Sequence, residues 1–161
     1  MCGTVRAARR GQCCVATLRL TMRLRSAVRC CNPALTHRAT LPRSAQVVHS
    51  AGVLKTGPVD AVGIDCWDAN MGTNGRSSFV LLHHCVPHLK ESEGNVIFVS
   101  SVNGTQSFAG CSAYCASKAA VDMLARCAAV DLAPYKVRIN CVNPGVIRTP
   151  LHQVSGMDDA K

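Results

Sequence analysis

From Gln46 onward, short apolar runs alternate with longer segments in which apolar residues recur at helical spacing. Four consecutive apolar residues, Val96–Val99, are typical of a strand that lies inside a parallel sheet and is covered on both faces. The succession of strand, helix, strand, helix and strand predicts an α/β fold with a doubly wound parallel sheet. The strands are expected at 47–48, 95–100 and 136–142, and the helices at 65–89, with Asp65 as N-cap, and at 112–132, ended by Pro134.

The start of the chain shows no such periodicity, and we therefore separate an N-terminal segment, 1–45, from a folded domain, 46–161. Residues 1–59 hold ten basic residues and no acidic one, giving +10, whereas residues 60–161 hold eight basic and nine acidic residues, giving −1. We interpret the start as a disordered segment or as a targeting-like extension that resembles a mitochondrial presequence. Nucleic acid is disfavoured as a partner, because no aromatic residue precedes Trp67 to stack on unpaired bases.

The spacing of the eleven cysteines fits neither a disulfide framework nor a zinc motif. Cys13–Cys14 and Cys30–Cys31 are vicinal pairs, which seldom bridge without strain, and no C-x-x-C occurs. This usage indicates a reducing compartment. No apolar run approaches 18 residues, so we expect no membrane span, and the start lacks the apolar core of a secretory signal. We expect a cytoplasmic protein, with mitochondria as the alternative.

The second predicted helix carries Tyr114 and Lys118, four residues apart and therefore on one helix face. A phenol ordinarily titrates near 10, and a nearby ammonium favours the phenolate, so Tyr114 is a candidate general acid/base. The pair alone is also compatible with two surface side chains at helical spacing. Ser101 lies thirteen residues before the tyrosine at the end of a predicted strand, where functional residues gather in parallel sheets.

Together these motifs make the chain resemble the short-chain dehydrogenase/reductase family from about Val47 onward. Y-C-A-S-K fits the Y-x-x-x-K motif of the family, and Ser101 has the family spacing before the tyrosine. Asn74, in W-D-A-N-M-G-T-N-G, fits the asparagine of the preceding helix, and N-P-G-V-I-R-T-P fits the segment that covers the nicotinamide. The resemblance implies a Rossmann-like sheet, of which this chain holds the C-terminal half.

The resemblance also implies a role for each residue of the motifs. Tyr114 would transfer a proton to or from the substrate oxygen, and Lys118 would lower the pKa of the phenol and bind the nicotinamide ribose. Ser101 would hydrogen-bond the carbonyl oxygen, and Asn74 would hold a water that links Lys118 to solvent. The cofactor would be NAD or NADP. Its remaining contacts are expected from Ser50, Ala51, Gly52, Pro144, Gly145, Ile147 and Thr149.

Two features depart from the pattern of the family. His49-Ser50-Ala51-Gly52 stands where the family has N-N-A-G, which puts the sheet contacts of the first position in doubt. Before Gly52 only Gly3 and Gly11 occur, so the G-x-x-x-G-x-G turn that receives the pyrophosphate is not found. We therefore interpret the chain as a truncated family member, and expect it to bind the cofactor weakly and to turn over slowly or not at all.

Two hypotheses for the function follow from the sequence. The first is an oxidoreductase that transfers a hydride between nicotinamide and a secondary alcohol or ketone. The second is a non-catalytic family member that acts as an interaction partner. The resemblance further implies a homo-oligomer that forms through helices 65–89 and 112–132. His84 and His88 have the spacing of a metal pair, but no carboxylate joins them, and we expect no metal site.

Overall fold

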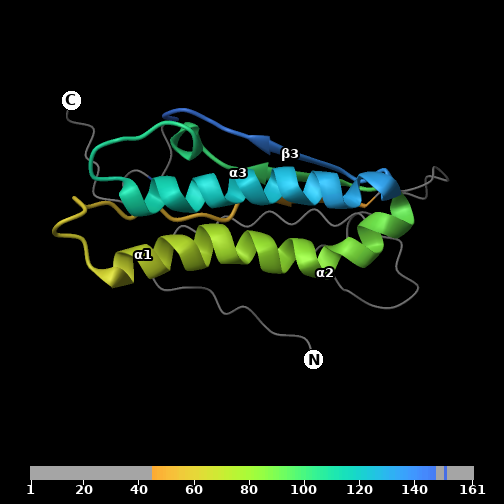
Figure 1. Ribbon diagram of the computed structural model, residues 1–161, viewed down its shortest axis with the longest axis horizontal. Helices are drawn as coiled ribbons and strands as arrows, with labels where there is room; N and C mark the ends of the chain where they lie inside the picture. Colours follow the sequence, from red (N-terminus) through yellow and green to blue (C-terminus); the bar gives the residue numbers. More distant parts are fainter. Residues whose placement is uncertain (1–44, 148–150, 152–161) are drawn as a thin grey trace, which may run out of the picture.

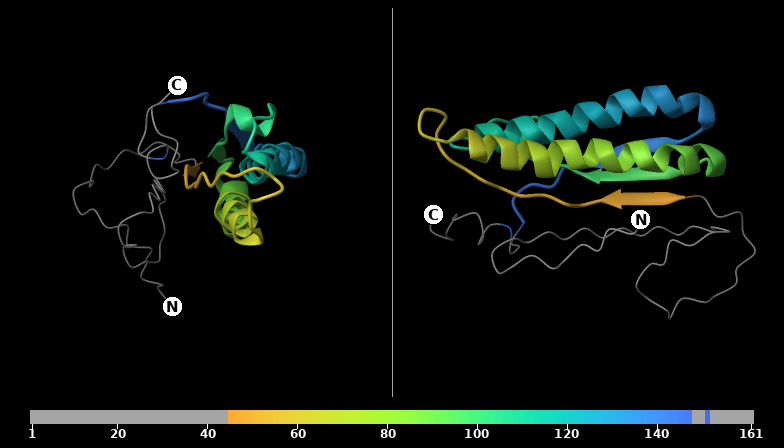
Figure 2. Two further views of the ribbon diagram at one scale, coloured as in Figure 1. Left: turned by 90° about the vertical axis from the view of Figure 1, so that its left-hand side faces the viewer. Right: turned by 90° about the horizontal axis from the view of Figure 1, so that it is seen from below.

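The computed structural model of the chain describes residues 45–147 and residue 151. Three parallel strands form one sheet in the order β1-β2-β3, and two long helical segments pack on one face of it (Figure 1). The two further views confirm that both helical segments lie on the same side of the strands (Figure 2). This arrangement agrees with the predicted α/β fold. Residues 1–44 of the predicted N-terminal segment, 1–45, and Thr149 lie outside the described residues, so what was expected of them stays a prediction.

The sheet is built from β1 (Gln46–His49), β2 (Asn95–Val99) and β3 (Arg138–Val142). β2 pairs with both neighbours and is therefore the central strand, as its apolar run predicts. Val96 and Phe98 are completely buried against the helices. Ala45 continues β1 into the core, and its carbonyl accepts a hydrogen bond from the N–H of Asn95 at 2.9 Å. The parallel register brings the carboxyl ends of all three strands to one edge of the sheet.

The first long helix differs from the single helix predicted at 65–89. It consists of α1 (Ile64–Asn70), a π-helical segment, η1 (Met71–Arg76), and α2 (Ser77–Ser92). Gly72 and Gly75 both lie within the π-helical segment, and glycine has a low intrinsic preference for a regular α-helix. Asp65 is not the N-cap, because the helix begins one residue earlier and Gly63 occupies that position without a side-chain cap.

The second long helix, α3 (Ser112–Leu132), has the predicted bounds. A 3-10 turn, η3 (Ala133–Tyr135), follows it and contains Pro134. Lys136 then adopts a left-handed backbone conformation with φ of 56°, so β3 begins two residues later than predicted. The turn therefore uses residues that the alternating pattern assigned to the strand.

The core lies between the sheet and the helices. Leu82 and Leu89 of α2 and Val121 and Ala125 of α3 meet the inward-facing side chains of the strands. Within 45–147, no helix is long and apolar enough to cross a membrane. The full cluster of buried apolar residues comprises Ala45, Val47, Leu82, Cys85, Leu89, Val96, Phe98, Val121, Ala125, Ala128, Leu132, Val137 and Ile139.

Candidate active site at the carboxyl edge of the sheet

Ser101 reaches the site from the carboxyl end of β2. It directly precedes a short 3-10 turn, η2 (Val102–Gly104), and its Oγ accepts a hydrogen bond from the N–H of Asn103 at 3.2 Å. The neighbouring Ser100 donates from its Oγ to the backbone carbonyl of Lys118 at 3.3 Å. The end of β2 is thus joined to the first half of α3, and Ser101 is buried at this junction.

Tyr114 and Lys118 enter the same space from the first half of α3. Both are buried, with only 7% and 5% of their surface exposed, so they are not a surface pair. Nζ of Lys118 lies 5.7 Å from the centre of the Tyr114 ring. Oγ of Ser101 donates to Oδ1 of Asn103 at 3.3 Å, and a side-chain hydrogen bond between Ser101 and Tyr114 acts to lower the pKa of the phenol. The structure therefore brings together the three residues that the sequence placed on two separate elements.

Burial sets the protonation of Tyr114. It raises the pKa of the phenol above its ordinary value of 10, while the hydrogen bond from Ser101 opposes this effect and the nearby Cys115 and Cys111 add to it. Lys118 is not among the groups that shift this pKa in the described structure, and the expectation that its ammonium lowers the pKa stays a prediction. The energetic cost of a buried phenolate outweighs the stabilisation that the site offers, and Tyr114 is a protonated phenol at neutral pH.

The ammonium of Lys118 is also destabilised by burial, which lowers its pKa from 10.5 to about 8. The negative charge of Asp122, and to a lesser degree Cys141, acts in the opposite direction. Nζ donates one hydrogen bond to the backbone carbonyl of Val99 at 3.0 Å. A lysine ammonium has three donors, so two remain for a ligand or water.

Asn74 lies in the π-helical segment and is almost completely buried. Its Oδ1 accepts from the N–H of Val53 at 2.8 Å, and its Nδ2 donates to the carbonyl of Val53 at 3.0 Å and to Oγ of Ser117 at 2.9 Å. The side chain thus joins the loop after β1 to α3. The expected role of Asn74, holding a water beside Lys118, stays a prediction.

The loop after β1 approaches the site at Gly52, which has no side chain. A Cβ placed on Gly52 would lie 3.4 Å from Oδ1 of Asn74 and 3.6 Å from Nζ of Lys118. Gly52 thus brings bare backbone next to the ammonium. Such a backbone leaves room for a flat or sugar-like group beside Lys118, which fits the nicotinamide end of a dinucleotide.

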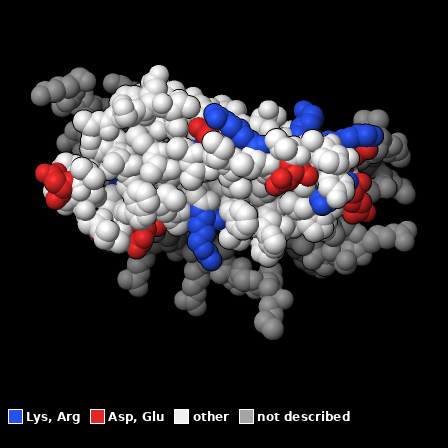
Figure 3. Space-filling view, in the orientation of Figure 1, with Lys and Arg blue, Asp and Glu red and all other residues white. Residues whose placement is uncertain are grey.

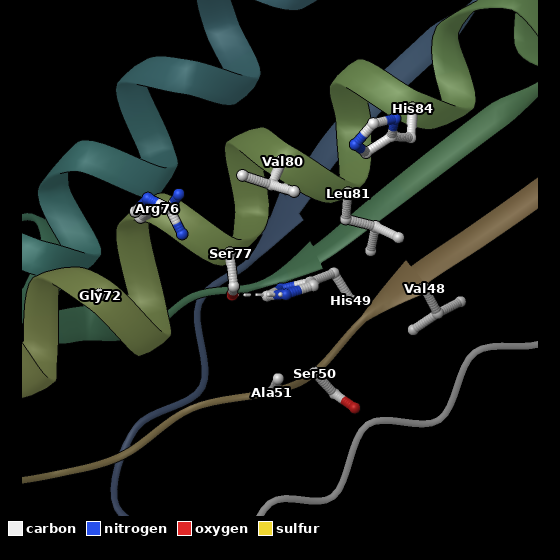
Figure 4. Close-up of a pocket in the computed structure, with 10 residues that line it drawn as sticks. All are labelled: Val48, His49, Ser50, Ala51, Gly72, Arg76, Ser77, Val80, Leu81 and His84. Atoms are coloured by element: carbon white, nitrogen blue, oxygen red, sulfur yellow. Dashed lines mark hydrogen bonds between the residues drawn. The ribbon is translucent and has the colours of Figure 1, made fainter. Parts of the chain in front are cut away.

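His49 keeps its place in the sheet although it departs from the family pattern, because it pairs in register with Phe98. Its ring contacts two serines of α2. Nε2 lies 3.1 Å from Oγ of Ser77 (Figure 4), and Nδ1 lies 3.3 Å from Oγ of Ser78. Burial and the charge of Lys118 lower the pKa of His49. The doubt about its sheet contacts is therefore removed.

A pocket of about 480 Å³ lies beside the carboxyl end of β1 (Figure 4). Of the predicted site residues, Ser50 and Ala51 line it, whereas Ser101, Tyr114 and Lys118 do not. Its walls are mainly apolar. The pocket is lined by Val48, His49, Ser50, Ala51, Gly72, Arg76, Ser77, Val80, Leu81 and His84.

The segment after β3 lies next to the turn that carries Ser101. The carbonyl of Pro144 accepts a hydrogen bond from the N–H of Val102 at 3.0 Å. A Cβ on Gly145 would meet no atom within 4 Å, and Ile147 is exposed. The structure therefore joins Pro144 to the site, while Gly145 and Ile147 border open space.

Sequence reasoning missed Asp122, and it included Asn143 only as the first residue of the N-P-G-V-I-R-T-P motif, without a role of its own. Asp122 is a buried acidic residue one helical turn after Lys118, and Asn143 donates a hydrogen bond to it. An acidic residue inside the Ala-rich stretch of α3 was the available signal. Within the part of the chain that the structure describes, no group of His, Cys, Asp and Glu side chains gathers as a metal site.

Comparisons with known proteins identify relatives of this arrangement. The sequence model of the family described as short chain dehydrogenase matches residues 20–160. A cyclopentanol dehydrogenase of Comamonas sp. is 40% identical over 108 residues, which is 66% of this chain and 43% of the relative. A trans-4-hydroxycyclohexanecarboxylate dehydrogenase of Sinomonas cyclohexanicum is 33% identical over 105 residues, 65% of this chain and 40% of the relative. The chain thus spans less than half the length of these relatives.

Solved structures of dehydrogenases also resemble this chain. A gluconate 5-dehydrogenase from Burkholderia cenocepacia in complex with NADP and tartrate superposes with a TM-score of 0.67 at 30% identity, over 71% of this chain and 45% of that protein. A 4-hydroxyisoleucine dehydrogenase complexed with NADH and succinate superposes with a TM-score of 0.63 at 29% identity, over 66% of this chain and 46% of that protein.

Proposed function

The chain belongs to the short chain dehydrogenase family, and we propose on that premise that it is an oxidoreductase acting on a secondary alcohol or ketone with NAD or NADP. The observation that carries the proposal is the buried cluster in which the Ser101 side chain hydrogen-bonds Tyr114 and Lys118 lies beside the same ring. The alternative, a non-catalytic interaction partner, is not favoured by relatives that are named as dehydrogenases.

The proton chemistry that we propose centres on the hydroxyl of Tyr114. Because burial raises the pKa of this phenol, the hydroxyl carries its proton at neutral pH and is ready to donate it to a carbonyl oxygen. Ser101, which already hydrogen-bonds Tyr114, would hold that oxygen in place. In the direction of alcohol oxidation, Tyr114 would accept the proton.

A bound nicotinamide would supply the hydride acceptor or donor. The ammonium of Lys118 has two donors left after its bond to Val99, and these suit ribose hydroxyls. The bare backbone at Gly52, together with Ser50 and Ala51, would border the same sugar. Pro144, Gly145, Ile147 and Thr149 would contact the nicotinamide ring.

For the substrate, we propose a cyclic secondary alcohol or the corresponding ketone. Support comes from the printed activities of two relatives, which act on cyclopentanol and on trans-4-hydroxycyclohexanecarboxylate. Both substrates present a secondary hydroxyl on a small ring. Asn103, Gln106 and Phe108, which follow Ser101 in the chain, are the proposed neighbours of that ring.

We also propose that the protein forms a homo-oligomer through its two long helical segments. A groove between them includes the apolar Phe79, which is 57% exposed, and is lined by Asp68, Met71, Gly72, Gly75, Arg76, Phe79, Ala120 and Leu124. Figure 3 looks onto the same helices, and most of this face carries neither acidic nor basic side chains. A second copy of this surface would cover its apolar side chains.

The compartment that we propose is the cytoplasm, with mitochondria as the alternative. All six cysteines of the described residues are free, which supports a reducing environment. The Arg-rich, acid-free start of the chain supports the mitochondrial alternative.

Nicotinamide fluorescence of the purified chain tests the cofactor proposal. We expect saturable but weak binding of NADH or NADPH, because the glycine-rich turn was not found in the sequence and several charge-assisted bonds to the pyrophosphate would be missing. Lys118→Met should weaken binding further. Lys55→Met is the matched control, because Lys55 is an exposed lysine outside the cluster. Absence of saturable binding at millimolar cofactor, or equal binding by the Lys118→Met protein, would contradict the proposal.

A further inference from the structure

A second polar cluster lies where α3 meets the carboxyl ends of β2 and β3. Asp122, one turn after Lys118, is buried there, and Asn143 directly follows β3. Nδ2 of Asn143 lies 2.9 Å from Oδ2 and 3.1 Å from Oδ1 of Asp122, and it also donates to the backbone carbonyl of Ser101 at 3.0 Å. The same carbonyl accepts from the N–H of Gly104 at 2.9 Å. One amide group therefore connects the helix, the turn after β2 and the end of β3.

The side chain of Asp122 is closely surrounded by the turn after β2 and by neutral polar groups. A Cβ on Gly104 would overlap Oδ2 of Asp122, so only glycine lets the turn approach this closely. The thiol of Cys141 hydrogen-bonds Asp122, and burial together with this contact raises the pKa of Cys141 to about 12, so the thiol keeps its proton. Both Asn143 and Cys141 are neutral partners. The negative charge of Asp122 is thus held by hydrogen bonds and lies one helical turn from Lys118.

We propose that Asp122 and Asn143 are positioning residues that hold the turn carrying Ser101 against the helix carrying Tyr114 and Lys118. The inference rests on the catalytic roles proposed above. Ser101 and Tyr114 come to the site from two different elements, and the Asp122–Asn143 bridge is a side-chain connection between these elements that holds Ser101 by its backbone carbonyl and not by its hydroxyl.

The same carboxylate acts on Lys118. The titratable groups that face this ammonium are Tyr114 and Asp122 on its own helix, Cys141 on β3 and His49 on β1. Among them Asp122 is the main group that favours the ammonium against burial, whereas a charged His49 would oppose it. Removing the charge of Asp122 should therefore lower the titration midpoint of Lys118.

Titration of Tyr114 tests the positioning role. The chain has two tyrosines, so a Tyr135→Phe background leaves Tyr114 as the sole phenolate signal in the ultraviolet. We expect Asn143→Ala to raise the midpoint of Tyr114 by about 0.5 pH unit, because the Ser101 hydrogen bond that lowers it is loosened. The same substitution in a Ser101→Ala protein should give no further shift.

Asn140→Ala, an exposed change on β3, is the matched control, and circular dichroism confirms that each variant stays folded across the titration. If Asn143→Ala does not fold, Asn143→Ser replaces it. An unchanged Tyr114 midpoint, or a shift that is equally large without the Ser101 hydroxyl, would overturn the proposal, because the bridge would then not act through Ser101.

Titration of Lys118 tests the charge of Asp122. Asp122→Asn keeps an acceptor for Asn143 but removes the negative charge, and it should lower the midpoint of Lys118 by about 1 pH unit. Lysine labelled with ¹³C reports the midpoint by nuclear magnetic resonance, and Lys118→Met assigns the signal. Asp131→Asn removes an exposed charge from the same helix and should leave the midpoint unchanged.

Equal midpoints for Lys118 in the Asp122→Asn and Asp131→Asn proteins would overturn the electrostatic part of the proposal. Both titrations report protonation rather than turnover. A chain without dehydrogenase activity would therefore count against the proposed function. The two titrations would still show whether the Asp122–Asn143 bridge acts on Tyr114 and Lys118.

Discussion

Burial disfavours the charged forms of both Tyr114 and Lys118 in this site. The phenol is driven toward its neutral form and so is the lysine, whose pKa falls to about 8. A spacing of four residues predicts that the two side chains are neighbours, which the structure confirms. It does not predict the direction of either pKa shift, because desolvation depends on residues that pack against the helix from β1, β2 and η1.

Lys118 should make the stability of the protein depend on pH in a defined window. Its pKa is about 8 in the folded chain and 10.5 when unperturbed, so the unfolded state binds the proton more tightly between these values. The cost of the buried ammonium is fully present below about pH 8 and is lost as the pH rises toward 10.5. The shift corresponds to a cost on the order of 3 kcal/mol.

Lys118→Met removes this cost. We expect the free energy of unfolding of the Lys118→Met protein, relative to the parent, to be most favourable near pH 7 and to decline as the pH rises to about 10.5. Chemical denaturation at several pH values measures this difference. A difference that is constant over that range would show that Lys118 titrates in the folded chain as it does in the unfolded chain.

At the scale of elements, the sequence predicted α3 and the central strand closely and the first long helix less well. α3 is rich in strong helix formers and is stopped by Pro134, so local preference and tertiary packing agree. The π-helical segment around Asn74 was not predicted, because its extra residue per turn follows from contacts between Asn74 and residues distant in the chain, Val53 and Ser117. Hydrophobic periodicity carries no information about such contacts.

The exposed face of the two long helical segments leads to a prediction about assembly. Phe79 lines the groove between them and is more than half exposed. If a second copy covers this groove, Phe79→Lys places a charge in an apolar interface and should convert the oligomer to a monomer. Analytical ultracentrifugation measures the mass of each species.

Val59→Lys is the control for this change, because Val59 is equally apolar and 80% exposed but lies in the loop before α1. It should keep the mass of the parent protein. A parent chain that is already monomeric, or a Phe79→Lys protein with unchanged mass, would contradict the proposed interface.

At the scale of the whole molecule, the described residues form a three-stranded sheet with helices on one face, and the chain spans less than half the length of its relatives. The α/β class and the family were accessible from the sequence because four motifs occur in order along the chain. The Asp122–Asn143 bridge was not, because Asp122 and Asn143 are 21 residues apart and meet only when β3 lies beside β2. The structure shows what the sequence does not: the carboxyl ends of β2 and β3 meet at α3.

The central claim is that proton transfer at Tyr114 accompanies hydride transfer to or from nicotinamide. The most direct measurement is the absorbance of the reduced cofactor during reaction with a cyclic secondary alcohol, at cofactor concentrations high enough to offset weak binding. Tyr114→Phe should lower the rate by about 10²–10⁴-fold while the fold is kept, and Tyr135→Phe should leave it unchanged. A Tyr114→Phe protein that turns over as fast as the parent would contradict the account.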